Sequence, residues 1–424
     1  MRTRTLLSAA ALALLALGAR AAEGDPPAVC ATQKGSILRR EKPDAKWQYV
    51  AEKEKLKAGE LLIGLPGAAL ESADKAAKLT FLTDFGDSPF PVIECAVVLH
   101  EPKGADLDFT LDRGRADVTN TKDKGAAKVR VRVHGAVFDL TLHEPKARVA
   151  VELYGRWAAG TRFTKDPGPK DIPAAYMVLL VLEGSAGLSH AGKTVHMAAP
   201  PDGALIQWDN KNGLDPAPSK LAELPAWAKP DVETNPKIKR LKKIFGRYYE
   251  LVKTKTLEEI LKDFIASEDP DFRVAFVVFC GALDRLDLAA PVMRDPKHAD
   301  LWDDAIRVLR HWIGRGPGQD QKLYKMLVDS GHYKPVDAET AVQLLHSFDE
   351  NDLARPETYD ALIDYLEDER PLIRALANWH LTRLVPAGKE FKFNPTADKK
   401  DRDEAVKKWR KLIPPGKLPP KPDK

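Results

Sequence analysis

The chain has 424 residues, of which 44% are hydrophobic, and its formal net charge at pH 7 is +4. This length leaves room for two or three domains with cores of their own, and so small a net charge gives no general attraction to nucleic acid. Three cysteines are too few for a disulfide scaffold. Cys30 and Cys95 could pair in an oxidising compartment, or Cys95 could be a core thiol, and Cys280 is expected in a helix core.

Residues 1–21 have the pattern of a secretory signal peptide. Arg2 and Arg4 precede an apolar run over residues 6–17, and Ala19-Arg20-Ala21 supplies a small-x-small cleavage site. The run is shorter than the roughly 20 residues of a membrane-spanning helix, and no other stretch is long and uncharged enough. We therefore expect an exported mature protein, periplasmic or extracellular, without a transmembrane segment.

Residues 30–209 are expected to form an all-β domain. Residues 107–112 and 116–119 flank Arg113-Gly114-Arg115, which predicts a hairpin turn there. Residues 129–133, 138–142 and 149–153 each alternate apolar and polar side chains, which predicts three consecutive antiparallel strands, a meander. The many short strands predict an antiparallel sandwich or a short β-solenoid.

The second half of the chain is expected to be helical. Residues 210–236 are rich in proline and predict a linker. Beyond it the apolar residues recur with helical spacing, as Ile238, Leu241 and Phe245 do, so residues 237–413 are expected to form an all-α domain. Residues 414–424 are rich in proline and lysine and predict an extended tail.

Four short motifs with glycine turns follow one another in the β region. In this order they resemble the FecR family, the extracytoplasmic domain of regulators that pass an outer-membrane signal to a sigma factor. The resemblance implies a sensory-regulatory role, although signalling members carry a cytoplasmic segment and a membrane helix where this chain has a signal peptide. The motifs are Gly35-Ser36-Ile37-Leu38 with Trp47 downstream, residues 56–62, residues 111–118 and Val181-Leu182-Glu183-Gly184.

Two stretches in the helical region share one pattern. Residues 268–275 and 368–376 each place an acidic corner before an apolar helix with an early arginine. They are similar to HEAT-type helical repeats. Such repeats stack into a solenoid, and the resemblance implies a surface that is presented to a partner protein.

Two motifs match the sequences of catalytic or nucleotide-binding sites without their structural context. Residues 187–194 satisfy the phosphate-loop pattern, but the following residues are short and β-like and Pro200-Pro201 blocks a helix, so we expect a hairpin turn and no nucleotide. Ser72-Ala73-Asp74-Lys75 matches the serine-lysine pattern of penicillin-binding enzymes, but no Lys-Thr-Gly follows it, so we expect a charged loop.

Histidines and aspartates of the β region do not form a recognisable metal motif. His134 with His143, and His190 with His196, could approach as pairs, but no third ligand stands at a typical spacing. The aspartates at positions 106, 108 and 112 lack the glycine and terminal glutamate of a calcium loop. We expect neither a metal nor a cofactor.

Two groups of residues are candidate contacts for a partner or a polymer. The first predicted helix carries a basic group, which is either a solvated face or a contact for an anionic envelope polymer or an acidic partner. Tryptophans near strand ends are either buried or part of a platform that stacks on sugars. The candidates are Lys239, Arg240, Lys242, Lys243, Arg247, Trp47 and Trp157, with Trp208 as a third tryptophan.

Together these patterns favour binding over catalysis. We expect a scaffold or sensory-regulatory protein of the bacterial cell envelope that contacts another envelope protein. An alternative is a module that binds carbohydrate or cell-wall polymer. A third hypothesis, an exported hydrolase, would need clustered carboxylates, for which Asp139, Glu144 and Glu152 are scattered candidates.

Overall fold

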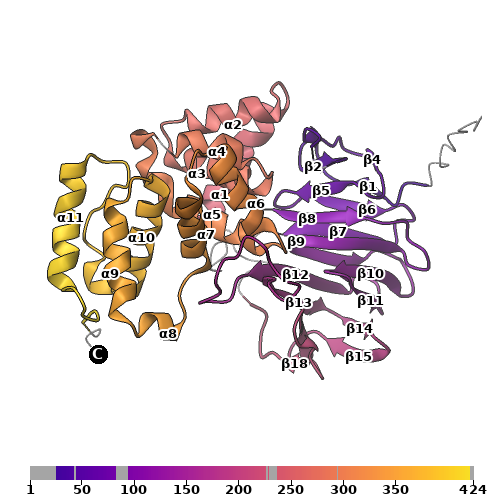
Figure 1. The fold of residues 1–424 in the computed structure, drawn as a ribbon. Coiled ribbons are helices and arrows are strands. Elements are labelled where there is room, and N and C mark those ends of the chain that lie inside the picture. The colour runs from indigo at the N-terminus through magenta and orange to yellow at the C-terminus, as the bar shows by residue number, and fades with distance from the viewer. Residues whose placement is uncertain are drawn as a thin grey trace, which may run out of the picture.

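The structure is a computed structural model that describes residues 25–42, 44–82, 94–225, 228, 236–293 and 295–420. An all-β domain is followed by an all-α domain, and the helices lie along one side of the strands (Figure 1). The predicted order of β and then α is therefore confirmed. The predicted signal peptide lies outside the described residues.

The β domain is a sandwich of two sheets, which resolves the choice between sandwich and solenoid. Sheet A has the order β4-β1-β6-β7-β9-β12-β13-β16, with β17 and β18 added on β16. Sheet B has the order β3-β2-β5-β8-β9-β10-β11-β14-β15. The strands are β1 (Ala28–Cys30), β2 (Ile37–Arg40), β3 (Gln48–Tyr49), β4 (Lys55–Leu56), β5 (Leu61–Gly64), β6 (Ala69–Ser72), β7 (Ala77–Leu82), β8 (Cys95–Leu99), β9 (Leu107–Asn120), β10 (Ala127–Val133), β11 (Ala136–Leu142), β12 (Arg148–Arg156), β13 (Ala174–Glu183), β14 (Ser185–His190), β15 (Lys193–Ala198), β16 (Gly203–Asp209), β17 (Gly213–Leu214) and β18 (Ser219–Lys220).

Strand β9 belongs to both sheets. Its first half pairs with β8 and, in parallel, with β10, whereas its second half pairs with β7 and β12. The hairpin predicted at Arg113-Gly114-Arg115 is therefore wrong. Gly114 has φ +86°, and one left-handed residue makes a bulge that bends a strand without reversing it. A Cβ at Gly114 would lie 2.4 Å from the backbone oxygen of Glu94, so only glycine fits this bend.

The predicted meander is correct for its first two strands and wrong for the third. The loop between β10 and β11 consists of His134 and Gly135, both with positive φ, which is the two-residue turn of an antiparallel hairpin. Strand β11 then pairs with β14 in sheet B, and β12 pairs with β9 and β13 in sheet A. The alternation of side chains identifies the face toward the core but not the neighbouring strand, and residues 143–147 cross between the sheets.

The core between the sheets is apolar and tightly packed. A Cβ at Gly64 would lie 1.9 Å from the ring of Phe81, so this glycine makes room for the phenylalanine. Cys30 and Cys95 are free thiols in this core, and Cys280 is a free thiol in the helical domain. Burial raises the pKa of each of the three thiols.

The stretch predicted as a linker is structured in its first part. Strands β17 and β18 pair with β16. Leu221, Leu224 and Ala228 then pack on the outer face of sheet A, against Leu180 and Leu182. Burial of these apolar side chains against the sheet stabilises the fold. A linker surrounded by water would not contribute this stabilisation.

The helices of the α domain begin at recognisable caps. Asp269 accepts a hydrogen bond from the backbone N–H of Asp271 at 3.0 Å and stands before Pro270, while Thr256 and Glu259 form a capping box. None of the described helices is long and apolar enough to cross a membrane. The helices are α1 (Pro236–Val252), α2 (Leu257–Ile265), α3 (Pro270–Ala282), α4 (Leu286–Val292), η2 (Pro296–Leu301), α5 (Trp302–Gly314), α6 (Gln319–Asp329), α7 (Pro335–His346), α8 (Glu350–Leu353), α9 (Pro356–Asp364), η3 (Tyr365–Glu367), α10 (Pro371–Leu384), η4 (Pro386–Gly388) and α11 (Lys399–Leu412).

The two domains share a hydrophobic core. Leu38, Ile63 and Ala96 of sheet B lie in the same buried cluster as the helices. At another point of the interface, the backbones of β12 and α5 touch, because a Cβ at Gly155 would lie 2.0 Å from the backbone oxygen of Gly314. The α domain is thus packed directly on the sandwich.

Candidate functional site

The candidate tryptophans Trp47 and Trp157 lie between the two domains. The indole Nε1–H of Trp47 donates to the backbone oxygen of Leu283 at 2.9 Å. That of Trp157 donates to the backbone oxygen of Ile313 at 3.1 Å, and its ring stacks on His346 with centroids 4.6 Å apart. Trp157 is only 9% exposed. Both side chains therefore join the domains rather than forming an open platform. The third tryptophan, at position 208, is buried between the sheets.

The basic group of α1 is partly used within the fold. Arg240 pairs with Asp271 at 2.7 Å, and Lys243 pairs with both Asp269 and Asp271 at the start of α3. These pairs hold α1 beside α3. Their carboxylates also interact favourably with the positive, N-terminal end of the α3 dipole. The other members of the basic group, Lys239, Lys242 and Arg247, are exposed.

A buried group of charges connects the domains near the bend of β9. Arg315 of the α domain lies 2.8 Å from the Glu94 carboxylate and 3.2 Å from Asp284. Arg113, next to the bend, lies 3.4 Å from Glu94 and donates to the backbone oxygen of Ala282 at 2.7 Å. Burial opposes ionisation of Asp284, but Arg113 and Arg315 outweigh it and lower the pKa of this carboxyl. The ion pairs of this cluster connect the β domain to the α domain.

The remaining sequence candidates do not come together as a reactive site. The rings of His143 and His196 face each other at 6.1 Å, a pairing across strands that the sequence did not predict. Across the described ranges, no three His, Cys, Asp or Glu side chains are placed to bind a metal. Residues 187–194 form the β14–β15 hairpin, as predicted.

The three candidate carboxylates have separate contacts. Asp139 pairs with Arg130 at 2.7 Å, and Glu152 pairs with Arg115 at 3.0 Å. Glu144 accepts a hydrogen bond from the Ser185 hydroxyl at 2.9 Å. Each carboxylate thus stabilises a local contact of the sandwich.

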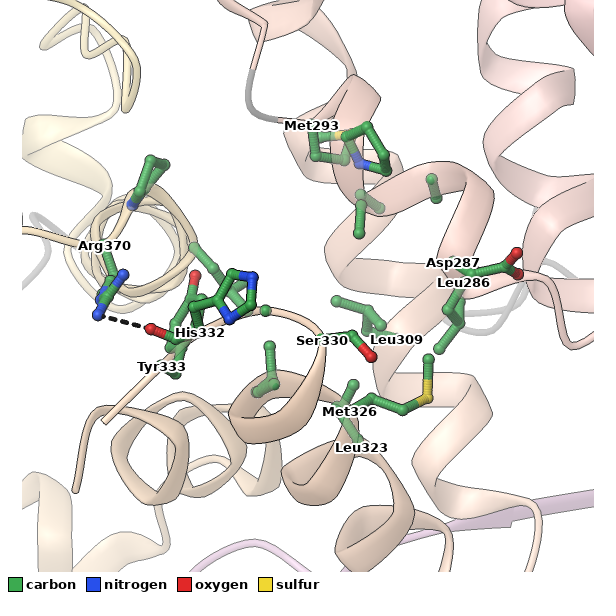
Figure 2. Close-up of a pocket in the computed structure, with 18 of the residues that line it drawn as sticks. Leu286, Asp287, Met293, Leu309, Leu323, Met326, Ser330, His332, Tyr333 and Arg370 are labelled. Carbon is green, nitrogen blue, oxygen red and sulfur yellow. Dashed lines mark hydrogen bonds between the residues drawn. The ribbon is translucent and has the colours of Figure 1, made fainter. Parts of the chain in front are cut away.

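An apolar groove of about 630 Å³ lies in the α domain. Its walls come from α3, α4, α5 and α6 and from the start of α10. A Cβ at Gly281 of α3 would lie 2.3 Å from Val308 of α5, so the glycine lets these two walls approach. Figure 2 shows apolar side chains along the groove, among them Leu286, Met293, Leu309, Leu323 and Met326.

Charged side chains stand at two sides of the groove, and each is paired within the fold: Asp287 with Arg285 at 2.9 Å and Arg370 with Asp337 at 3.3 Å. Figure 2 shows Asp287 at one side of the groove and Tyr333 and Arg370 at the opposite side. Arg370 donates to the backbone oxygen of His332 at 3.0 Å and lies 4.7 Å from the centre of the Tyr333 ring. Hydrogen bonds from Arg285 lower the pKa of Asp287, so this carboxyl is ionised at neutral pH.

One polar group in the apolar wall lacks a partner. Trp302 lines the groove and is 7% exposed. Its indole Nε1–H has no hydrogen-bond partner within the part of the chain that the structure describes. A buried donor without an acceptor is costly, and because this N–H is closed off from solvent, it is a local cost of the fold and not a contact for a ligand.

The sequence did not reveal this groove. Its walls come from five helices, and each helix contributes apolar residues that look like ordinary core positions. No short motif marks it. The nearest local signal is Pro291 inside α4, which interrupts the helix at the edge of the groove.

Comparisons with known proteins identify no family for this chain. No family model and no curated protein matches the sequence. Two crystal structures of a "putative anti-sigma factor" from Parabacteroides distasonis ATCC 8503 match at 14% and 12% identity, each with a TM-score of 0.17. The match covers 43% of this chain and spans about half, 55%, of that protein. At this TM-score the match does not define a shared fold.

Proposed function

We propose that this protein is a non-catalytic binding protein of the bacterial cell envelope that acts through protein–protein contacts. The groove of the α domain takes up the apolar face of an amphipathic helix from a partner, and the sandwich supports the groove. The signal-peptide pattern of residues 1–21 supports export, and the resemblance to FecR proteins supports a sensory-regulatory setting.

The observation that carries this proposal is the apolar groove, which is lined by side chains of five helices. Grooves that bind helices offer apolar pockets for side chains spaced by one helical turn, and methionines such as Met293 and Met326 adapt to varied side chains. The groove is open at Ala290 and Pro291, which are exposed.

The two other sequence-based hypotheses have less support from the described residues than binding of a partner protein has. A carbohydrate module was suggested by Trp47 and Trp157, and both bridge the domains. A hydrolase would need carboxylates gathered on one rim, whereas the three candidates make separate structural contacts. We therefore propose no second function.

Photo-crosslinking in intact cells tests the proposal. The full chain carries p-benzoylphenylalanine either at position 290, in the groove, or at position 354, an exposed alanine outside it. We expect one protein to crosslink at position 290 and not at 354, through a segment with apolar residues at helical spacing. A peptide of that segment is then expected to bind the purified full chain.

The affinity of that peptide supplies the decisive comparison. Ala290→Arg places a charge against the apolar helix face and is expected to weaken binding at least about tenfold. The matched variant Ala354→Arg adds the same charge elsewhere and should leave the affinity unchanged. A lipid captured at position 290, equal capture at both positions, or equal affinities of the two variants would contradict the proposal.

A further inference from the structure

A second cavity lies at the seam between the two domains, separate from the groove. It has a volume of about 330 Å³. The β domain contributes Arg156 and Tyr176, from β12 and β13, and the α domain contributes Arg310 of α5 and Ser347 after α7. The buried ring of Trp157 forms part of its wall. Each domain thus brings one arginine to the same space.

These two arginines differ from their neighbours in having no carboxylate partner among the described residues. Close to the seam, Arg162 pairs with Asp352, Arg315 with Glu94 and Arg383 with Asp303. Arg156 instead lies over the ring of Tyr176, 5.4 Å from its centre. The described lining of the cavity contains no aspartate or glutamate.

Of the two arginines, Arg310 is the one whose positive charge is more costly without a carboxylate partner. Burial, together with the nearby charge of Arg383, lowers the pKa of Arg310 to about 10. One of its N–H groups donates to the backbone oxygen of Leu345 at 2.7 Å, near the end of α7, and its guanidinium lies 5.0 Å from the ring centre of Trp379. The helix-end contact uses one of five donors. A partly buried cation without a counter-charge is costly, and a bound anion would remove that cost.

We propose that the seam cavity binds a small oxyanion, a phosphate or carboxylate group, between Arg156 and Arg310. Guanidinium groups match the oxygens of both anions with paired hydrogen bonds. Tyr176 and Ser347 line the same cavity and bring hydroxyl groups that can donate to a third oxygen. An anion held there would link β12 to α5, so its binding would stabilise the contact between the domains.

Calorimetric titration of the full chain with sodium phosphate and, separately, sodium acetate tests this site at constant ionic strength. We expect saturable binding of at least one anion to a single site. The anion that binds shows whether the natural ligand carries a phosphoryl or a carboxylate group. Arg156 is exposed, so Arg156→Gln should fold normally, and we expect it to weaken binding at least about tenfold.

Arg247→Gln is the matched control, because Arg247 is an exposed arginine of α1 that does not line the cavity. It should bind the anion as the unmodified protein does. Arg310→Gln, which keeps an amide donor for Leu345, is expected to abolish binding, and its circular dichroism would show whether it folds. Saturable binding of neither anion, or equal affinity of Arg156→Gln and Arg247→Gln, would overturn the proposal.

Discussion

At the scale of single residues, His380 shows how burial sets a charge state. This side chain in α10 is 2% exposed, and its Nε2 lies 2.7 Å from the backbone oxygen of Leu344, so the neutral ring donates that hydrogen bond. Burial lowers the pKa of His380 to about 3, with Arg310 and Arg383 acting in the same direction and the Leu344 contact opposing them. Folding therefore requires the histidine to stay neutral.

This requirement predicts loss of stability in mild acid. An unfolded histidine has a pKa near 6.5, so between this value and about 3 the unfolded chain binds more protons than the folded one. The stability from His380 is complete above about pH 6.5 and falls by up to about 1.4 kcal/mol per pH unit as pH decreases. His380→Gln keeps the donor and should reduce the loss between pH 7 and pH 5 by about 2 kcal/mol.

Urea unfolding at pH 7 and pH 5 measures this difference. Part of the pH dependence of stability should remain in His380→Gln, because His311 is also buried and has a lowered pKa. His196→Gln changes an exposed histidine and should behave as the unmodified chain does. Equal pH dependence for His380→Gln and the unmodified chain would show that His380 does not titrate as described.

At the scale of elements, β9 is the strand that unites the sandwich. Four strands pair with it, two in each sheet, and the transfer between sheets takes place at Gly114. The bend also places Arg113 in the charge cluster between the domains. One glycine thus determines the sheet arrangement and part of the interdomain contact.

Two glycine substitutions separate backbone conformation from close packing. Gly114→Ala would put a Cβ 2.4 Å from a backbone oxygen at φ +86°, and we expect a loss above about 3 kcal/mol. Gly125 has nearly the same φ, +84°, with nothing within 4 Å of a Cβ, so Gly125→Ala should cost only about 1–2 kcal/mol. Thermal unfolding compares them, and equal losses would rule out the packing argument.

The sequence predicted the elements better than their partners. The alternation of apolar and polar residues over 129–133 and 138–142 located β10 and β11. A half-buried strand needs apolar side chains on its buried face and polar ones on its exposed face. It could not distinguish a bend from a reversal at Gly114, because both use a left-handed glycine and only distant strands decide between them. The groove and the seam cavity depend on contacts between helices and strands far apart in the chain, which no local pattern encodes.

At the scale of the whole molecule, the interface makes the domains interdependent. Leu38, Ile63 and Leu65 of the β domain are fully buried in one cluster with the helices. Glu94 and Arg315 are buried ion partners across the interface, and separating them would leave charges unpaired at the newly exposed surfaces. Such an interface resembles a core more than the mobile contact of independent domains.

We therefore expect the full chain to unfold in a single cooperative transition. Hydrogen exchange followed by mass spectrometry along a urea series can monitor peptides from β9 and from α5 in one experiment. The two sets should lose protection with the same midpoint. Two midpoints, with either domain protected while the other is open, would contradict this expectation.

The shared interface also imposes an order on biosynthesis. The strands that carry Leu38, Ile63 and Ala96 are made before any helix that covers them, and α1 ends at Val252. The last strand of the sandwich, β18, ends at Lys220, so at ribosomal speeds of roughly 5–20 residues per second the delay until Val252 is on the order of a few seconds. During that time a newly folded sandwich would expose an apolar face to water, a surface on which chaperones could act and where nascent chains could aggregate.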